Sequence, residues 1–486
     1  MTHNIVSIFG GHDANITFYN STTKKYHIIE IERLTGERYF QLKKNSDVYV
    51  KDILEQCQTI ATNFWGIEND YDTLLIDARW KNRGIPDVIC QVFNTREMKT
   101  ISNHHHDNHA YCAYYQSPYR EALIVSYDGG GDGQSFNFYY VKGDDMELIE
   151  SLPYNLGREY WKSASRIKVI VDNSKTRREY AGKMMGLSAY GKVDEQSKLD
   201  VDIAATAQKK FANKLLSNLG RHITDIPIIL TGGCALNVLV NEKIKQKYNN
   251  PVFVPPNPHD GGLSLGHIFN FIKPDKRVDV TYSGIPLLDR DELSDYIVKY
   301  DAVKVSKMQI AEKLKEGKII GFVYGDSEIG PRALGNRSIV CDPTYPDMKD
   351  KLNSKVKFRE WYRPFAPFCR REIAQKYFET KDYENLEYMS FAPKVKIDNI
   401  PAVTHIDRSA RLQTVTKTSH KHFYDLLIEF GKISNIEVLL NTSFNIKQKP
   451  ILTRISDAIN MLNNTELDYI IIEDYLFTKN VKISNN

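Results

Sequence analysis

The chain has 486 residues, with 65 Lys and Arg against 61 Asp and Glu and a formal net charge of +4. One hydrophobic core seldom serves so long a chain, so two or three domains are expected. A nearly balanced charge favours neither nucleic acid nor a membrane surface as a partner, and any anion binding must therefore be local. The six cysteines form no CxxC pair, no stretch approaches the ~20 apolar residues of a membrane span, and the N-terminus lacks a signal-peptide pattern. These features predict a cytoplasmic protein with reduced thiols.

The N-terminal residues predict a hairpin followed by a helix and a strand. An apolar run at 4–9 ends in a Gly-Gly-His-Asp turn at 10–13, and two strand-like segments then flank a polar turn. Residues 47–65 carry apolar side chains at spacings of three and four, which is typical of a helix, and 71–78 predicts the next strand. Glycines after a first strand suit a loop that faces a phosphate, although most such pairs only mark a turn.

A histidine-rich segment at 101–118 predicts a further helix. His105 and His109 are four residues apart and would share one helical face, as a pair of metal ligands requires. His106 and His109, three residues apart, are a competing pair. A solvated helix start rich in histidine is equally compatible with this spacing. The spacing alone leaves these alternatives open.

Two glycine turns follow apolar strands, at 128–131 and at 232–233. The first joins the strand-like runs of 121–140, where an ordinary hairpin turn is the plainer interpretation. The second separates a buried strand from a helix within 226–244. Its amides would stand at a helix N-terminus, which favours phosphate, so the sequence predicts a nucleotide contact there.

A linker-like stretch at 275–305 predicts the boundary between two domains, which we place at 1–290 and 291–486. A helix, a glycine and a strand then lead into the C-terminal domain. No internal repeat and no low-complexity tract is visible in the sequence.

The segment Val323–Phe368 concentrates cations, glycines, prolines and aromatic residues. Gly330, Pro331 and Gly335 predict a turn that exposes backbone N–H groups beside Arg332, as an anion site requires. Guanidinium groups also match the paired oxygens of phosphate and carboxylate. A solvated charged face is the alternative, because acidic residues are interspersed. We predict an anion-binding pocket, with the cations walled in by Phe358, Trp361, Tyr362, Phe365 and Phe368.

Several long motifs resemble those of a known family. GDSEIGPRALGNRSI, KFREWYRPFAP and NTSFNIKQKPI are similar to the C-terminal domain of the O-carbamoyltransferases of nodulation and antibiotic biosynthesis. HHDNHAYCAY, GKMMGLSAYG and LTGGCALN resemble the N-terminal domain of the same family. The resemblance implies an α/β protein with an N-terminal ASKHA domain of the actin/hexokinase-like, Kae1-like type. It also implies a C-terminal YrdC/Sua5-like α/β domain.

The resemblance assigns site residues as well. It selects His105 and His109, rather than the pair with His106, and adds Asp260 as ligands of iron or another divalent metal. The nucleotide-binding residues that it implies in the N-terminal domain are Gly129, Gly130, Lys183, Gly232, Gly233 and Asn237. Together with the predicted anion pocket, it places ATP and carbamoyl phosphate against Arg332, Lys357, Arg359, Arg363, Arg411, Asn441, Ser443 and Asn445.

The activity that the resemblance implies is ATP-dependent O-carbamoyl transfer, with Mg²⁺ accompanying ATP. Carbamoyl phosphate and ATP would form carbamoyl adenylate in the C-terminal domain, where Lys357 and Arg363 stabilise charge. The carbamoyl group would pass to a hydroxyl of a small-molecule acceptor at the metal site, with His12 or Asp13 as the base. The acceptor is not readable from the sequence, and a homodimer is among the expected assemblies. The alternatives are a threonylcarbamoyl-type tRNA-modifying enzyme and a non-catalytic ATP-binding ASKHA module.

Overall fold

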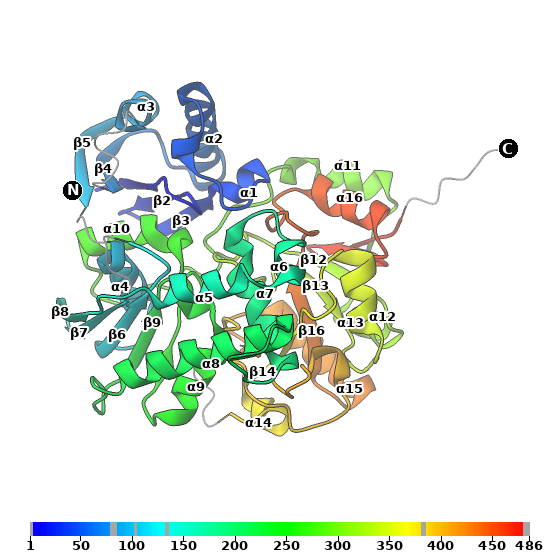
Figure 1. The fold of residues 1–486 in the computed structure, drawn as a ribbon. Coiled ribbons are helices and arrows are strands. Elements are labelled where there is room, and N and C mark those ends of the chain that lie inside the picture. Colours follow the sequence, from blue (N-terminus) through cyan, green and yellow to red (C-terminus); the bar gives the residue numbers. More distant parts are fainter. Residues whose placement is uncertain (1–2, 78–84, 102–104, 132–135, 381–384, 480–486) are drawn as a thin grey trace. The chain divides into compact units, whose positions relative to one another are not determined.

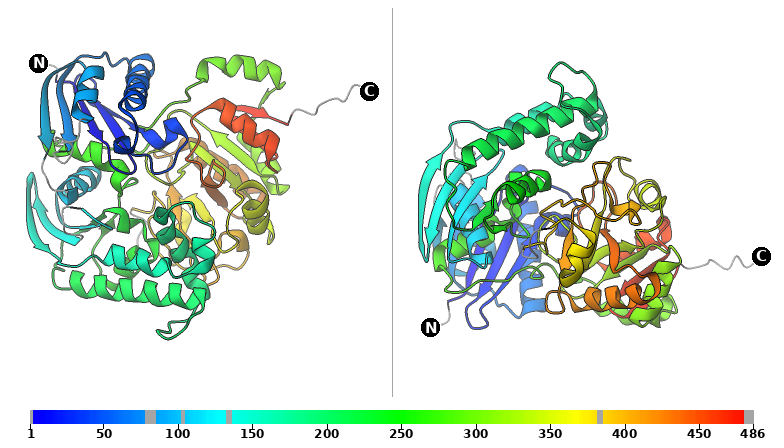
Figure 2. Two further views of the ribbon diagram at one scale, coloured as in Figure 1. Left: turned by 45° about the horizontal axis from the view of Figure 1, so that its top comes forward. Right: turned by 90° about the horizontal axis from the view of Figure 1, so that it is seen from below.

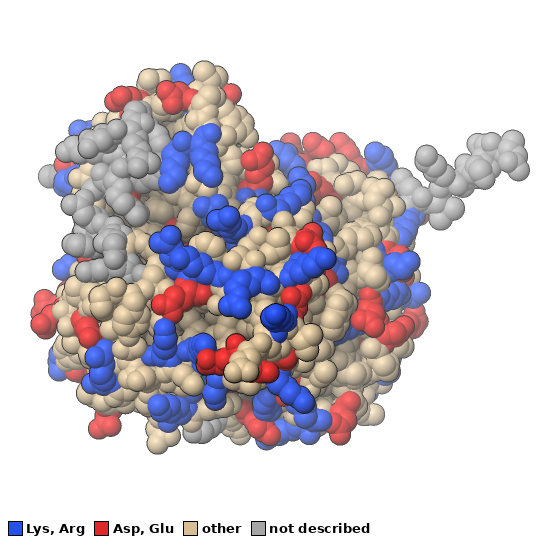
Figure 3. Space-filling view, viewed as in Figure 1, with Lys and Arg blue, Asp and Glu red and all other residues tan. Residues whose placement is uncertain are grey.

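The computed structural model describes residues 3–77, 85–101, 105–131, 136–380 and 385–479. The chain divides into two compact units (Figure 1). Unit 1 comprises Met1–Ile285 together with Ile329–Pro331, and unit 2 comprises Pro286–Glu328 and Arg332–Asn486. Within the described ranges, no helix has both the length and the apolar character needed to cross a membrane. Lys and Arg are interspersed with Asp and Glu over the face drawn in Figure 3, in keeping with the nearly balanced composition.

Unit 1 contains two five-stranded sheets, which the views of Figure 2 show in blue and in cyan to green. The first sheet has the order β3-β2-β1-β4-β5. Its strands are β1 (Ile5–Phe9), β2 (Asn15–Asn20), β3 (Lys25–Glu30), β4 (Tyr71–Asp77) and β5 (Thr95–Ile101). The first three strands form an antiparallel meander, and β4 and β5 extend the sheet in parallel from β1.

The second sheet repeats this arrangement strand for strand. Its order is β10-β9-β6-β7-β8, with β6, β7 and β8 as the antiparallel meander and β9 and β10 added in parallel to β6. The strands are β6 (Glu121–Tyr127), β7 (Phe136–Lys142), β8 (Asp145–Ser151), β9 (Ile228–Thr231) and β10 (Val252–Phe253). This duplicated topology is that of an ASKHA domain, so the expected fold of the N-terminal part is confirmed.

Two helices between the sheets bring the ends of their strands together. Helix α4 packs on β6 and β9, helix α10 packs on β1, β2 and β4, and the two helices contact each other. Aromatic rings fill this layer, with Phe269 of α10 5.7 Å from Tyr115 of α4 between ring centroids. The helices of unit 1 are α1 (Ile31–Thr35), α2 (Asp47–Trp65), α3 (Ile85–Val92), α4 (His105–Gln116), α5 (Leu156–Ala164), α6 (Lys168–Val171), α7 (Tyr180–Leu187), α8 (Asp200–Leu219), α9 (Val238–Lys247) and α10 (Leu263–Ile272).

Helix α2 shows how local sequence sets an element. Ser46 caps its first turn by accepting the N–H of Tyr49, and Gly66 ends it in the left-handed conformation with φ +64°. The predicted helix at 47–65 therefore has the bounds that the structure shows. The second strand of the predicted hairpin ends at Glu30, and helix α1 begins at the next residue, Ile31.

Unit 2 is built on one eight-stranded mixed sheet with the order β11-β18-β17-β12-β13-β16-β14-β15. The strands are β11 (Val303–Lys304), β12 (Ile320–Val323), β13 (Arg337–Cys341), β14 (Ala366–Arg370), β15 (Gln413–Val415), β16 (Val438–Ser443), β17 (Tyr469–Ile472) and β18 (Tyr475–Phe477). The expected second α/β domain is therefore present.

Helices α12 and α15 pack against each other, and the core beneath them includes Phe322, Phe368 and Phe423. Phe423 stacks on Phe368 with 4.6 Å between ring centroids, which fixes α15 over β14. The helices of unit 2 are α11 (Leu293–Lys299), α12 (Lys307–Lys315), α13 (Met348–Lys351), α14 (Ala374–Tyr377), α15 (Lys421–Ser434) and α16 (Ile455–Asn464).

Candidate metal and anion sites

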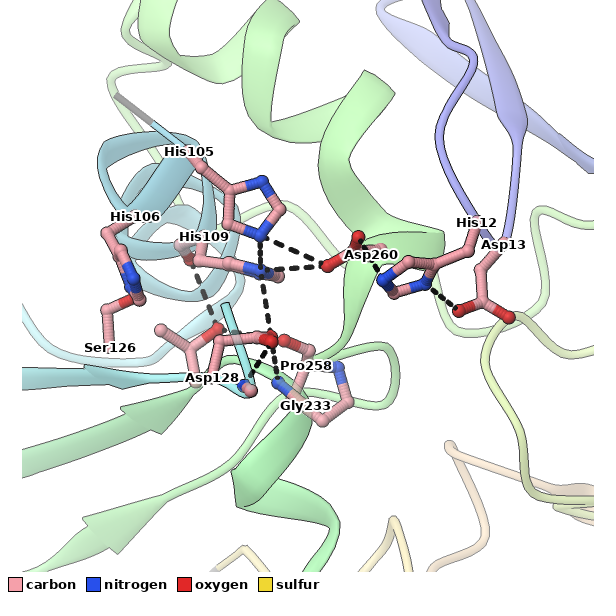
Figure 4. Close-up of polar contacts among 12 residues, drawn as sticks. His12, Asp13, His105, His106, His109, Ser126, Asp128, Gly233, Pro258 and Asp260 are labelled. Atoms are coloured by element: carbon pink, nitrogen blue, oxygen red, sulfur yellow. Dashed lines mark hydrogen bonds and ion pairs between the residues drawn. The ribbon is translucent and has the colours of Figure 1, made fainter. Parts of the chain in front are cut away.

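The three predicted metal ligands converge in unit 1. His105 and His109 lie one turn apart on α4, and their Nε2 atoms are 3.1 Å from each other (Figure 4). Asp260 begins the short helix before α10, and its Oδ1 lies 3.2 Å from His105 Nε2 and 3.3 Å from His109 Nε2. The pair separated by four residues thus faces the carboxylate.

Asp128 is a fourth member that the sequence reasoning missed as a ligand. It follows β6 directly, and its Oδ2 lies 3.5 Å from His109 Nε2. One ligand atom from each of His105, His109, Asp128 and Asp260 lies within 4.8 Å of all the others, and all four residues are buried. We call these residues the ligand cluster. A strand that ends in an aspartate before a glycine turn was the available signal.

His106 does not belong to this cluster. Its Nδ1 lies 2.8 Å from the hydroxyl of Ser126, away from the carboxylates (Figure 4). His106 is 1 % exposed, and His105 and His109 are buried too, so the alternative of a solvated histidine-rich helix start is wrong. A buried imidazole bonded to a serine is a packed polar contact rather than an open ligand.

The electrostatics of the ligand cluster favour a cation at its centre. Burial opposes charge on His109, but its hydrogen bonds with Asp128 and Asp260 raise its pKa to about 9. Burial likewise opposes charge on Asp128, and the hydrogen bond with His109 outweighs it and lowers the pKa of that carboxyl to about 2. Burial is also outweighed at Asp260, where the charges of His12 and His105 hold the pKa well below its usual range. Both carboxylates are therefore ionised, and the charge that balances them sits on imidazoles, where a metal ion would replace protons. Two imidazole nitrogens and two carboxylates are a donor set that fits a first-row divalent metal.

His12 and Asp13 adjoin the ligand cluster. His12 Nδ1 lies 2.8 Å from Asp13 Oδ2, and His12 Nε2 lies 3.3 Å from Asp260 Oδ2 (Figure 4). The charge of Asp260 raises the pKa of His12 to about 9. Asp13 adopts φ +58°, a conformation that non-glycine residues seldom take and that is common at functional sites. Since the His12 side chain is 41 % exposed, a substrate can reach it.

The two predicted glycine turns meet at Asp128. The N–H of Gly129 and the N–H of Gly233 each donate to one oxygen of its carboxylate, the second over 2.7 Å. Gly232 has φ +88°, and a Cβ there would lie 2.2 Å from the carbonyl oxygen of Tyr127. Only glycine allows β9 to approach the end of β6 this closely. At Gly130 a Cβ would meet nothing within 4 Å, so that part of the turn is open.

Lys183 and Asn237, the other predicted nucleotide contacts, lie in unit 1 with their polar atoms engaged. Lys183 is 3 % exposed, and its Nζ donates to the carbonyl of Asn173 over 2.6 Å and pairs with Glu179 over 2.8 Å. Asn237 caps helix α9 and shares hydrogen bonds of 3.1 Å with Gln208.

In unit 2, the structure joins the Lys-x-Arg and Ser-x-Asn motifs. Lys357 is 3 % exposed, and its Nζ donates to the backbone carbonyls of Ser443 and Asn445 and to the Asn445 side chain. Ser443 Oγ in turn donates to Asn445 Oδ1 over 2.7 Å. The lysine therefore holds the turn after β16, with Ser443 at its start.

Four arginines gather in the same unit, and we call Arg332, Arg359, Arg363 and Arg411 the arginine cluster. Burial and then the charges of Arg363 and Arg332 hold the pKa of Arg359 well below its usual range. The pKa of Arg411 is lowered by burial and by the charges of the other three. Arg411 Nε is buried without a hydrogen-bond partner in the described part of the chain. Guanidinium groups that repel each other around a buried, unpaired donor are typical of an anion-binding site.

The expected aromatic walls are only partly present. Arg359 stacks on the buried ring of Phe365 with its Cζ 4.3 Å from the centroid, and Tyr362 and Phe368 are buried. Phe358 and Trp361 are instead 47 % and 57 % exposed. The expectation that all five rings enclose the cations is therefore wrong. Three rings pack into the interior, where apolar burial stabilises them more than a polar rim would.

Two further residues of the predicted anion pocket, Gly330 and Asn441, make their contacts within the protein. Gly330 lies in unit 1, where its carbonyl accepts a hydrogen bond of 2.6 Å from Arg33, and a Cβ on it would meet the carbonyl of Pro256 at 2.2 Å. Asn441 is fully buried on β16 and donates to the carbonyl of Ala333 and to Gln413. Both residues hold protein segments in the structure.

In the comparison with known protein families, the N-terminal and C-terminal parts of the chain each match a separate family model. Residues 34–214 match the family model "Carbamoyltransferase N-terminus", and residues 311–479 match "Carbamoyltransferase C-terminus". Nodulation protein NolO of Bradyrhizobium diazoefficiens is 30% identical over 77% of this chain and 78% of its own. The chain belongs to the carbamoyltransferase family. It is accordingly an enzyme that transfers carbamoyl groups.

Two further relatives show how widely the family extends. The 3'-hydroxymethylcephem-O-carbamoyltransferase of Streptomyces clavuligerus is 26% identical to this carbamoyltransferase over 97% of the chain and 98% of the relative. Uncharacterized protein MJ1051 of Methanocaldococcus jannaschii is 30% identical over 79% of the chain and 84% of its own. Among solved structures, full-length HypF in a phosphate- and nucleotide-bound form reaches a TM-score of 0.37 at 15% identity. That alignment covers 56% of this chain and 46% of HypF, a likeness too slight to bear on function.

Proposed function

We propose that this carbamoyltransferase is an ATP-dependent O-carbamoyltransferase with one half reaction in each part of the chain. Residues 291–486 would form carbamoyl adenylate, and residues 1–290 would transfer its carbamoyl group to a hydroxyl and release AMP. The observation that carries the proposal is the presence of two chemically different sites. The arginine cluster suits polyanionic substrates, whereas the ligand cluster beside His12 suits activation of a carbonyl and of a hydroxyl.

In the first half reaction, carbamoyl phosphate, ATP and water would give carbamoyl adenylate, phosphate and pyrophosphate. The arginine cluster would bind the phosphate oxygens of both substrates, and Mg²⁺ would accompany ATP. An anion among these guanidinium groups would relieve the repulsion that lowers the pKa of Arg359 and of Arg411. Arg363, and Lys357 after exchanging one of its present acceptors, would stabilise the charge that develops as pyrophosphate leaves, while Ser443 and Asn445 orient the carbamoyl group. The exposed rings of Phe358 and Trp361 are not needed for this step.

In the second half reaction, the residues of unit 1 would activate both reactants. The ligand cluster fits iron or another divalent first-row metal, which when bound would polarise the carbonyl of the carbamoyl group as a Lewis acid. A bound cation would neutralise the charge of Asp260, which is the main cause of the raised pKa of His12. His12, oriented by its hydrogen bond to Asp13, would then be neutral and take the proton of the acceptor hydroxyl. The same arrangement of an acid, an imidazole and a reacting hydroxyl occurs in other enzymes that activate alcohols.

The glycine turns of unit 1 would receive the nucleotide part of the adenylate. The N–H groups of Gly129 and Gly233 donate to Asp128 and so hold the two turns together. The open backbone at Gly130 would then receive the phosphate. Lys183 and Asn237 would complete the contacts by exchanging a present partner for the nucleotide.

The acceptor class follows from a relative and from the site. The name of the Streptomyces clavuligerus relative specifies a hydroxymethyl group as the acceptor of that enzyme, and we extend the hydroxyl, but not the cephem, to this chain. The test is mass spectrometry of products formed from ATP, carbamoyl phosphate and a panel of hydroxyl compounds, with pyrophosphate measured in parallel. A carbamoylated acceptor that appears only with ATP supports the proposal. Carbamoylation without ATP, or without release of pyrophosphate, would refute it.

A further inference from the structure

A buried amide network in unit 2 contacts the chain next to proposed substrate contacts. Its centre is Gln413, the first residue of β15, which is 1 % exposed. Gln413 Nε2 donates to the carbonyl of Leu334 over 2.8 Å, and Gln413 Oε1 accepts from Asn441 Nδ2 over 2.8 Å. Both ends of the amide are thus used, which neither a carboxylate nor an apolar side chain of the same size reproduces.

The network fixes the backbone that follows Arg332. Asn441 Nδ2 donates to the carbonyl of Ala333 over 3.1 Å, so two consecutive carbonyls are held by two side-chain amides that also bond to each other. The fully buried carboxylate of Glu328 accepts the N–H groups of Leu334 and Gly335. Leu334 is therefore fastened at both its N–H and its C=O.

The same residues are adjacent in sequence to the other anion contacts. Gln413 lies two residues after Arg411, and Asn441 lies two residues before Ser443 on β16. Side chains two apart on a strand project from one face of the sheet, so Asn441 and Ser443 share a face. The network consequently links the segments that carry Arg332, Arg411 and Ser443.

We propose that Gln413 is a positioning residue, which sets Arg332 relative to Arg411 for the anionic substrate. The inference rests on the proposed function, because it takes the arginine cluster as the site of carbamoyl phosphate and ATP. Burial and then the charge of Arg332 lower the pKa of Arg411, so the two guanidinium groups repel each other, and a fixed backbone limits how far they can move apart. Gln413 supplies that constraint without touching the substrate. Asn441 is then an interior residue that orients Gln413, rather than a contact of the substrate.

The test compares Gln413→Met with Thr414→Val in the full-length chain. Thr414 is the next residue of β15, is 1 % exposed, and its hydroxyl has no hydrogen-bond partner within the described residues, so its replacement is a matched buried change on the other face. In a pyrophosphate-release assay, the KM for carbamoyl phosphate should rise about tenfold or more in Gln413→Met, because a misplaced binding group weakens substrate binding and orientation. The KM of Thr414→Val should stay at the wild-type value.

The KM separates positioning from folding. A purely structural role would reduce the folded fraction and hence the apparent kcat, whereas the KM of the folded molecules would not change. Gln413→Asn, which keeps an amide one methylene short of its partners, should raise the KM as well and serves where Gln413→Met is insoluble. Calorimetric binding of inorganic pyrophosphate gives a second readout that needs no catalysis.

The outcomes distinguish the two levels of the argument. Wild-type protein that releases no pyrophosphate contradicts the proposed function, and the calorimetric comparison then still tests Gln413. Wild-type protein that is active, together with an unchanged KM and unchanged pyrophosphate binding in both Gln413 variants, overturns the inference alone.

Discussion

Asp128 Oδ2 accepts the backbone N–H of Gly233 over 2.7 Å and lies 3.5 Å from His109 Nε2. One carboxylate thus joins the turn after β9 to the histidine pair on α4. Its second oxygen accepts the N–H of Gly129, so the side chain is oriented from both turns. Donors of this kind hold a ligating carboxylate in place, and their loss commonly weakens metal binding.

We therefore expect Asp128→Ala to lose metal. The variant keeps the histidine pair and Asp260 but removes one of two charged ligands, so affinity for divalent iron should fall by at least about 100-fold. Elemental analysis of purified protein and titration with the metal measure this. Asp128→Asn, which retains one carbonyl oxygen for the glycine amides, should fall less. Full metal occupancy in Asp128→Ala would remove this residue from the ligand cluster.

His109→Ala and His106→Ala form a second, matched test. His109 faces both carboxylates, whereas His106 is bonded to Ser126. His109→Ala should lose bound metal and carbamoyl transfer while pyrophosphate release continues, since that reaction is assigned to the other unit. His106→Ala should keep its metal. Metal retained in the first variant and lost in the second would mean that the ligand set is wrong by one residue.

Lys357→Ala and Arg363→Ala should slow pyrophosphate release that depends on carbamoyl phosphate. Removing one charge-assisted contact from a site of this kind costs about 2–4 kcal/mol of barrier, or a ~100-fold lower rate. Lys355→Ala is the control, because that side chain is 57 % exposed and pairs only loosely with Glu466, at 3.5 Å. Wild-type rates in both test variants would reject the assignment of this site.

The free energy of unfolding should depend on pH in a way that reflects the titration of the buried His420 imidazole. Its Nδ1 caps α15 by accepting the N–H of Phe423, and burial lowers its pKa to about 3. Between pH 6.5 and 3 the unfolded chain binds a proton that the folded protein does not, so the free energy of unfolding falls as the pH falls. The contribution is at most ~1.4 kcal/mol per pH unit.

His420→Asn keeps a capping side chain and removes the titration. Urea unfolding of unit 2, followed at pH 7, 6 and 5, should therefore show a shallower decline in this variant than in wild type. His422→Asn, which alters a half-buried ring stacked on Tyr324, is the comparison. Equal slopes in wild type and His420→Asn would contradict the assignment.

Much of the architecture was predictable from the sequence because its signals are local. The helix at 47–65 is set by its spacing and caps, and the long motifs carried the family and its fold. The duplication of the two sheets was not predictable, since only backbone topology is repeated and the side chains have diverged. It became visible only through the pairing of β6 with β9 and of β1 with β4.

Site residues were predictable where a sequence motif contains them. They were less predictable where tertiary contacts determine the role of the side chain. Asp128 was grouped with a glycine turn because an aspartate before glycines is ordinary turn chemistry. Its place in the ligand cluster depends on the packing of α4 against β6, which no local sequence pattern predicts. Lys183 stands in a family motif, yet the structure pairs it with Glu179 on its own helical segment. Gln413 carries no motif, and only its buried contacts mark it.

The repeated topology of the two sheets of unit 1 has a consequence for the ligand cluster. His12 and Asp13 follow the first strand of one copy, and Asp128 follows the first strand of the other. The histidine pair begins the helix after β5, and Asp260 stands just before the helix after β10. The first half of this repeated topology therefore supplies both imidazoles of the ligand cluster, and the second half supplies both carboxylates. Metal binding requires the two halves to be packed together, so it is also a readout of that packing.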